Sequence, residues 1–179
     1  MIIRSCLTFA GRSVLLAAAL ACLADDYDLL SKHHLTLPIE GLTARDIQDT
    51  FDQGRAGGKP HEASDLLAPR GTPIMAVDDG VIQKLFLSKP GGLTIYEFDR
   101  QGVYCYYYAH LDRYAEGLRE GMHVRQGEVI GYVGTSGNAP PNTPHLHFAI
   151  FKLGLEKHWW QGVAINPYPL LMKLAKHAK

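Results

Sequence analysis

The sequence has few cysteines from which disulfide bonds could form. Its 179 residues include three cysteines, and only Cys105 lies beyond residue 22. A single cysteine cannot form an internal disulfide, so a small domain held together by disulfide bonds is excluded. Cys105 falls in a run typical of β-strands, residues 103–108, and nothing nearby would lower the pKa of its thiol. We therefore expect Cys105 to pack in the core.

The sequence also lacks net charge, because 18 basic residues balance 18 acidic ones. The first 21 residues hold two arginines and no acid, so the remaining chain has 16 basic and 18 acidic residues, a net charge of −2. No basic stripe remains, which argues against a nucleic-acid partner. With 46% hydrophobic and 20% charged residues, the composition is that of a globular domain and excludes a disordered chain.

No hydrophobic run is long enough for a membrane-spanning helix, which needs about 20 residues. The apolar run nearest the N-terminus, residues 14–24, is 11 residues long and follows Arg4 and Arg12. A basic start, a short apolar core and small residues at its end are typical of a secretory signal. We expect residues 1–24 to direct export to the periplasm or cell envelope of a bacterium. The alternative is an uncleaved membrane anchor, which would also include the weaker apolar stretch at residues 6–11.

Cys22 follows Ala19, Leu20 and Ala21 and resembles the lipidated cysteine of a bacterial lipobox. The lipobox usually has leucine three residues before the cysteine, where this sequence has Ala19. Ordinary cleavage near Ala21 or Ala24 is therefore the alternative to a lipid attached at Cys22.

Beyond the leader, residues 25–37 are predicted to be a polar, irregular linker, residues 38–172 a single domain, and residues 173–179 a tail. Short β-prone runs bounded by glycine, proline and aspartate predict a mainly β, antiparallel sandwich or open barrel, with the protein a monomer. The strands are expected at residues 72–77, 81–86, 93–98, 103–110, 127–134 and 145–152. Only residues 111–120 and 169–177 have a helical pattern, which predicts two short peripheral helices.

Four histidines and one aspartate form the informative set. In a strand, His145 and His147 would project to one face while Leu146 turns into the core. Three N and O ligands with one water describe a catalytic zinc site. His61 and Asp65, four residues apart, could complete such a ligand set and leave two histidines for proton transfer. On its own, a His-x-His pair in a strand is more often a surface pair than a ligand pair, and a His-x-x-x-Asp pair is common by chance.

Three motifs occur in order: His61-Glu-Ala-Ser-Asp65, Tyr108-Ala-His110-Leu111 and Pro144-His-Leu-His-Phe148. In them, and across about residues 38–171, the chain resembles the lysostaphin/LytM-type zinc endopeptidases, which cleave peptide cross-bridges of bacterial peptidoglycan. The family's motifs are His-x-Gly-x-Asp, Tyr-x-His-Leu and Pro-His-Leu-His-Phe. The resemblance implies the family's duplicated hybrid motif fold and a secreted peptidase that acts on peptidoglycan stem or cross-bridge peptides.

Carried over by position, the resemblance implies that His61, Asp65 and His147 bind one Zn²⁺ ion. It implies that His145 acts as general base on the zinc-activated water and that His110 hydrogen-bonds the developing oxyanion or the water. Which of His110 and His145 takes the proton stays open, because the two can titrate together.

The sequence departs from the family at Ala63, where the motif has glycine, and at Ser64, where an aliphatic residue is usual. Alanine does not adopt positive φ at low cost. All five functional side chains are nevertheless present, which favours an active enzyme. The alternative is a catalytically weak wall-binding module that activates other wall hydrolases. A similarity to biotinyl carrier domains in residues 76–82 and 120–131 lacks the required lysine and indicates shared β architecture.

Three further groups of residues have two interpretations each. Trp159 and Trp160 could line a wall-binding groove, or could pack with one ring inside and one outside. Arg55 and Lys59 could contact substrate, or could belong to a solvated loop. The tyrosines at 106–108 alternate in direction along their strand, so at least one is expected in the core.

Overall fold

The computed structural model describes residues 27–55 and 58–177. The chain divides into two units, residues 1–33 and residues 34–179. In the first unit, residues 27–32 are helical, so the expectation of an irregular segment over 25–37 is wrong there. The predicted leader and Cys22 lie outside the described residues. Within those residues, no helix is both long and apolar enough to cross a membrane.

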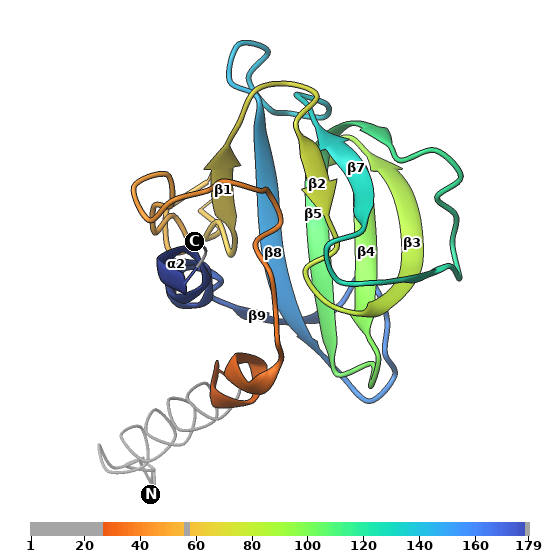
Figure 1. Ribbon diagram of the computed structural model, residues 1–179. Helices are drawn as coiled ribbons and strands as arrows, with labels where there is room; N and C mark the ends of the chain where they lie inside the picture. The colour runs from red at the N-terminus through yellow and green to blue at the C-terminus, as the bar shows by residue number, and fades with distance from the viewer. Residues whose placement is uncertain (1–26, 56–57, 178–179) are drawn as a thin grey trace, which may run out of the picture. The chain divides into compact units, whose positions relative to one another are not determined.

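The second unit is built on a nine-stranded antiparallel sheet that does not close (Figure 1). The strand order is β1-β8-β5-β4-β3-β6. In addition, β7 pairs with both β5 and β2, and β9 pairs with β8. The strands are β1 (Ser64–Leu67), β2 (Pro73–Met75), β3 (Gly80–Ser88), β4 (Gly92–Asp99), β5 (Tyr104–Tyr114), β6 (His123–Val124), β7 (Val129–Val133), β8 (His145–Leu153) and β9 (Gly162–Ile165). The helix α2 (Tyr168–His177) follows β9. The predicted mainly β, antiparallel architecture with short helices is confirmed.

Alternation along the two central strands separates the core from the face that carries the predicted site. In β5, Tyr106 and Tyr108 are fully buried while Tyr107 is partly exposed on the opposite side. In β8, Leu146 is fully buried between His145 and His147, as expected. Cys105 is also buried, and burial raises the pKa of its thiol well above the usual value, which fits a packing role.

The predicted helix over residues 111–120 is wrong. Residues 111–114 continue β5, and Leu111 lies opposite Val133 of β7. Leu111 is fully buried in this pairing, so burial in the sheet outweighs a local pattern compatible with a helix. Strands β1, β6 and β9, each of four residues or fewer, were not predicted.

Two glycines bring the β3–β4 turn against the loop that precedes β8. Gly92 and Gly137 both have positive φ, at 64° and 76°. A Cβ atom on Gly92 would collide with Ser136, and one on Gly137 would collide with the backbone of Gly91 and Gly92. Only glycine permits this close approach, which places the Ser136 carbonyl beside β5.

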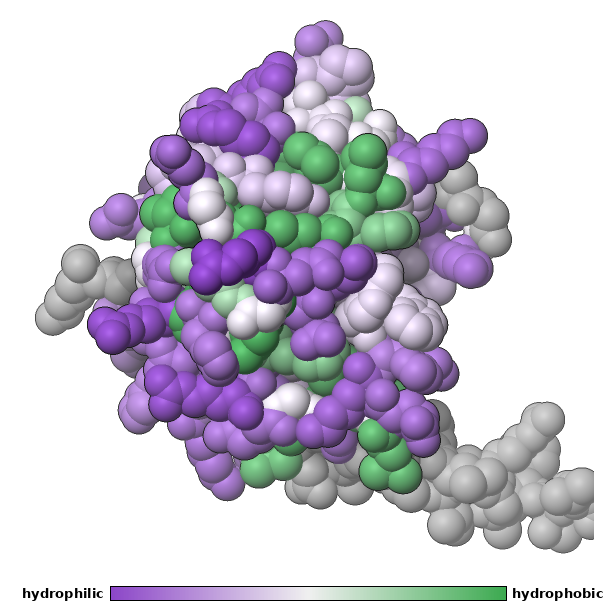
Figure 2. Space-filling view, turned by 90° about the vertical axis from the view of Figure 1, so that its right-hand side faces the viewer, coloured by the Kyte–Doolittle hydropathy of each residue, from purple (hydrophilic) through white to green (hydrophobic). Residues whose placement is uncertain are grey.

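Hydrophobic side chains are also exposed on the outer strand β3. Figure 2 shows the side of the molecule that lies on the right in Figure 1, where β3 is found. In the upper middle of that view, hydrophobic side chains form a group that hydrophilic side chains divide. In β3, Leu87 is 70% exposed and Phe86 is 39% exposed.

Candidate metal centre and active site

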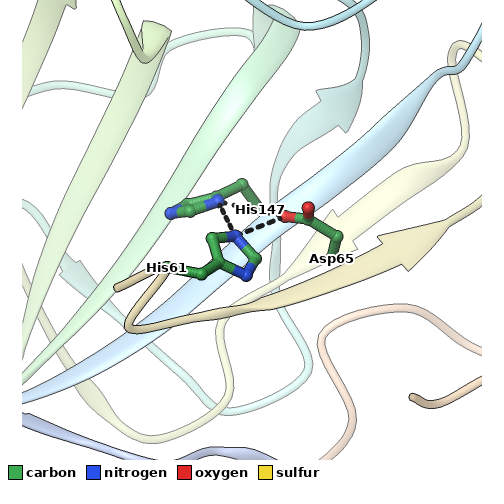
Figure 3. A group of neighbouring side chains, drawn as sticks. All are labelled: His61, Asp65 and His147. Carbon is green, nitrogen blue, oxygen red and sulfur yellow. Dashed lines mark hydrogen bonds and ion pairs between the residues drawn. The ribbon is translucent and has the colours of Figure 1, made fainter. Parts of the chain in front are cut away.

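Three side chains point toward one another, two from one short segment and the third from a distant strand (Figure 3). His61 precedes β1, Asp65 lies in β1, and His147 lies opposite Asp65 in the neighbouring strand β8. The Nε2 atom of His61, the Oδ1 atom of Asp65 and the Nδ1 atom of His147 are each 3.0 Å from the other two. These atoms form the one compact group of potential metal ligands found among the described residues.

The donor set fits a divalent cation. The Nδ1–H of His61 donates to the carbonyl oxygen of Thr50 at 3.0 Å, which leaves a lone pair on Nε2 of a neutral ring. That lone pair faces the carboxylate oxygen of Asp65 at 3.0 Å, a repulsive arrangement unless a positive charge lies between them. A tetrahedral zinc ion with bonds of about 2.0–2.1 Å sets its ligand atoms about 3.3 Å apart. The observed spacing is close to that value.

Asp65 is held in its charged form. Burial works against ionisation, but the imidazole of His147 outweighs it and holds the pKa of Asp65 well below its usual value. Its second oxygen, Oδ2, accepts a hydrogen bond from Arg55 at 2.6 Å, so the two oxygens face different partners. The carboxylate is therefore fixed in an orientation that leaves Oδ1 directed at the two imidazoles.

Thr50 supports two of these ligands and was not identified from the sequence. Its hydroxyl lies 3.1 Å from Nδ1 of His61, accepts a hydrogen bond from the backbone N–H of Asp65 at 3.3 Å and donates to the carbonyl of Ala63 at 3.2 Å. Such outer contacts orient metal ligands and fix histidine tautomers. No motif marks Thr50, which lies 11 residues before His61.

His145 and His110 are the two remaining predicted site residues, and both lie beside the ligand group. Nε2 of His145 is 3.8 Å from Oδ1 of Asp65, and the rings of His145 and His110 are 4.9 Å apart. The Nδ1–H of His145 donates to the carbonyl of Thr143, and that of His110 donates to the carbonyl of Ser136, both at 2.8 Å. Each neutral ring therefore keeps a lone pair on Nε2. Burial lowers the pKa of His110 to about 4, which keeps its ring neutral near pH 7.

The backbone at His110 is strained. Its φ is 62°, a value uncommon for a residue with a side chain, and its backbone N–H donates to the carbonyl of Gly91 at 2.8 Å. The β4–β5 register shifts between Leu93 and Ile95, at the same place. This irregularity interrupts the alternation of β5 just where the chain reaches His110.

Alanine at position 63, where the family motif has glycine, does not strain the backbone. Ala63 is fully buried and is not among the residues with positive φ, whereas its neighbour Glu62 has a φ of 57°. Positive φ therefore falls one residue earlier than the family's glycine suggests, and the methyl group of Ala63 is packed.

The ligand group opens on a groove of about 370 Å³. Five of the residues that line it are His61, His110, His147, Tyr107 and Arg55. Three of the five predicted site residues, His61, His110 and His147, thus line the groove, while Asp65 and His145 lie directly beside them. Arg55 joins them through its contact with Asp65. The groove can admit an extended segment of peptide next to a metal ion and two imidazole bases.

Comparison with known proteins agrees with this geometry. The model of the family described as Peptidase family M23 matches residues 59–167. A curated relative from Bacillus subtilis (strain 168), named L-Ala--D-Glu endopeptidase, is 34% identical over 149 residues, which cover 79% of this chain and 44% of the relative. Peptidoglycan DD-endopeptidase ShyC from Vibrio cholerae is 35% identical over 100 residues, which cover 56% of this chain and 22% of the relative. The chain thus matches less than half the length of either relative.

Solved structures show the same fold. The catalytic domain of the antimicrobial peptidase lysostaphin from Staphylococcus simulans superposes with a TM-score of 0.59 at 28% identity, covering 70% of this chain and 90% of that chain. A putative glycyl-glycine endopeptidase lytM from Ruminococcus gnavus superposes with a TM-score of 0.63 at 27% identity. The match covers 83% of this chain and 61% of that chain. The resemblance to the lysostaphin/LytM type drawn from the three motifs is confirmed.

Proposed function

Because this chain belongs to peptidase family M23, we propose that it is an exported, zinc-dependent endopeptidase that hydrolyses peptide bonds in the stem or cross-bridge peptides of peptidoglycan. The observation that carries the proposal is the triangle of ligand atoms from His61, Asp65 and His147, each 3.0 Å from the others. The relative named peptidoglycan DD-endopeptidase ShyC supports the substrate class, and the relative named L-Ala--D-Glu endopeptidase supports peptide-bond hydrolysis.

His61, Asp65 and His147 would hold the zinc ion through Nε2, Oδ1 and Nδ1. When bound, zinc supplies Lewis acidity that polarises a peptide carbonyl and makes a water molecule easier to deprotonate. The negative charge of Asp65 and two neutral imidazoles suit this ion, and Thr50 and Arg55 keep the ligands in place.

His145 and His110 are the residues that can carry out proton transfer. Their Nδ1–H groups are held by the carbonyls of Thr143 and Ser136, so Nε2 of each ring is the atom that can accept a proton from the attacking water. The protonated imidazole can then donate to the nitrogen of the leaving amine. The second histidine can donate a hydrogen bond to the carbonyl oxygen, as negative charge develops there, only when its Nε2 atom also carries a proton. The rings are 4.9 Å apart, so both Nε2 atoms lie beside the same reacting groups, and which of the two takes the proton stays open.

The predicted leader motivates the proposed location, which is the periplasm or cell envelope, with a lipid at Cys22 as one form of attachment. The alternative function is a wall-binding module that activates other hydrolases. Retention of all five site residues, grouped around one groove, favours the enzyme.

The test is to purify the 179-residue chain, measure bound zinc by mass spectrometry, and follow the loss of turbidity of a peptidoglycan suspension. The wild-type chain is expected to bind one zinc ion and to clear the suspension. His147→Ala removes a ligand and is expected to lose both properties. His123→Ala, which changes an exposed histidine in β6, serves as the matched control and is expected to keep both.

Equal clearing by wild type and His147→Ala would refute the proposed enzyme. Bound zinc without release of peptide fragments by the wild type would favour the regulatory module instead. Mass analysis of fragments released from defined cross-linked muropeptides identifies the bond that is cut.

A further inference from the structure

A second cavity, of about 400 Å³, lies beside the groove and is lined mainly by aromatic side chains. Its lining residues are Glu62, Tyr96, Tyr107, Phe151, Trp159, Trp160, Gln161 and Gly162. Tyr107 lines both this aromatic cavity and the catalytic groove. The two cavities therefore adjoin, and a ligand of the aromatic cavity would lie next to the groove.

A continuous series of rings connects the metal centre to this cavity. The ring of Tyr107 is 5.9 Å from that of His147 and 4.6 Å from that of Tyr96, which is in turn 4.8 Å from Trp159. The path from His147 to Trp159 is thus at most about 15 Å, the length of four or five extended residues. One substrate molecule can occupy both places.

The two tryptophans have different surroundings. Trp159 is partly buried and packs against Phe86 at 5.3 Å and against Tyr96. Trp160 is 61% exposed, and its ring lies 4.5 Å from that of His158 at an interplanar angle of 17°. The stacked imidazole and the edge of Trp159 hold the exposed indole in place before any ligand arrives.

The charges of the two cavities differ. The aromatic cavity is lined by one carboxylate, Glu62, and one amide, Gln161, and no lysine, arginine or histidine is among its described lining residues. The catalytic groove, in contrast, is lined by Arg55. A peptide segment with carboxylates would be repelled by Glu62, whereas a neutral ligand with a flat apolar face and hydroxyl or amide groups suits the aromatic cavity.

We propose that the aromatic cavity binds an N-acetylated amino sugar of the glycan strand that carries the peptide substrate. The inference rests on the proposed function, since it names the second part of the same polymer. The C–H face of the sugar ring would lie on the indole of Trp160, and its hydroxyl and acetamido groups would hydrogen-bond with Glu62 and Gln161. The sugar would then position the attached peptide in the catalytic groove.

Tryptophan fluorescence tests this directly, because the chain has two tryptophans and both line the cavity. The probe is tetra-N-acetylchitotetraose, with cellotetraose, which lacks acetamido groups, for comparison. The N-acetylated sugar is expected to change the emission saturably and to bind more tightly than cellotetraose. Trp160→Ala is expected to weaken binding about tenfold or more, with Trp159 as the remaining reporter, and Trp160→Phe to restore most of it.

Leu155→Ala is the matched control, since Leu155 is 99% exposed in the same connection between β8 and β9 but does not line the aromatic cavity. It is expected to bind the sugar as the wild type does. Unchanged emission with the N-acetylated sugar, or equal affinity in wild type and Trp160→Ala, would overturn the inference. So would a saturable change caused by a sugar-free stem peptide, which would make the cavity a peptide subsite.

A kinetic readout separates this inference from the proposed function. The wild type is expected to have a lower KM for a stem peptide attached to its disaccharide than for the same peptide without sugar, and Trp160→Ala to bring the two KM values together. A ratio that Trp160→Ala leaves unchanged contradicts the inference. Failure to hydrolyse either substrate, with sugar binding intact, refutes the proposed function and leaves the sugar site supported.

Discussion

A carboxyl group buried far from solvent should make the free energy of unfolding depend on pH. Glu97 in β4 is fully buried, and its Oε2 atom accepts a hydrogen bond from the hydroxyl of Tyr108 at 2.7 Å. Its Oε1 atom has no hydrogen-bond partner among the described residues. Burial raises the pKa of Glu97 to about 8, and the nearby charges of Asp78, Asp79 and Asp99 act in the same direction.

The sign follows from the protons bound in each state. Between pH 4.5 and about 8 the folded protein keeps the proton on Glu97 while the unfolded chain has lost it, so the free energy of unfolding falls as pH rises. One pKa unit corresponds to about 1.4 kcal/mol, so a shift from 4.5 to about 8 corresponds to a loss of about 5 kcal/mol across this range. Glutamine resembles the protonated acid and does not titrate. Glu97→Gln should therefore remove this loss.

The assay is urea unfolding of wild type and Glu97→Gln at pH 5, 6, 7 and 8. We expect nearly equal stability at pH 5 and an advantage of about 3–5 kcal/mol for Glu97→Gln at pH 8. Titration of other groups, including the site histidines, is common to both proteins and cancels in the difference. The exposed Glu116 provides the control, and Glu116→Gln should follow the wild type at every pH. A difference between wild type and Glu97→Gln that does not change with pH would refute the reasoning.

Three further predictions concern the site. His110→Ala and His145→Ala should each keep one zinc ion per chain, measured by mass spectrometry, and lose turnover by about a hundredfold or more on a muropeptide substrate. Thr50→Val should lower zinc affinity about tenfold or more, measured by competition with a chelator, because a hydroxyl that supports two ligands is lost. Ala63→Gly, which restores the family's motif, should lower stability by about 1 kcal/mol in urea unfolding without raising turnover, since Ala63 is packed and does not have positive φ.

A specific result would contradict each of these three predictions. Loss of zinc from His110→Ala or His145→Ala as complete as that from His61→Ala would mean that the division between ligands and proton carriers is wrong. Unchanged zinc affinity in Thr50→Val would remove Thr50 from the support of the ligands. Faster turnover by Ala63→Gly would show that the motif's glycine serves the chemistry through the backbone.

The grouping of the candidate site residues was easier to predict from the sequence than the path of the chain that supports them. Two-residue and four-residue spacings placed His145 with His147 and His61 with Asp65, because strand alternation and short loops keep near neighbours together. The contribution of Thr50 depends on a contact across 11 residues in an irregular segment, which leaves no periodic signal.

The errors in the predicted fold also arise from contacts between residues that are distant in the sequence. Residues 111–120 have apolar residues at helical spacing, yet Leu111 gains full burial by pairing with Val133, and no local pattern reports that pairing. Strand β1 is four residues long and contains Asp65, so it does not have the apolar run by which a strand is recognised. The aromatic cavity likewise forms only when β4, β5 and the connection between β8 and β9 come together.

The proposed function requires that His61, Asp65 and His147 hold one divalent ion. A crystal structure of the zinc-loaded protein, with diffraction measured on both sides of the zinc absorption edge, locates that ion directly. We expect a single anomalous peak about 2.0–2.2 Å from Nε2 of His61, an oxygen of Asp65 and Nδ1 of His147. A peak coordinated instead by His110 or His145 without Asp65, or no peak at this site, would contradict it.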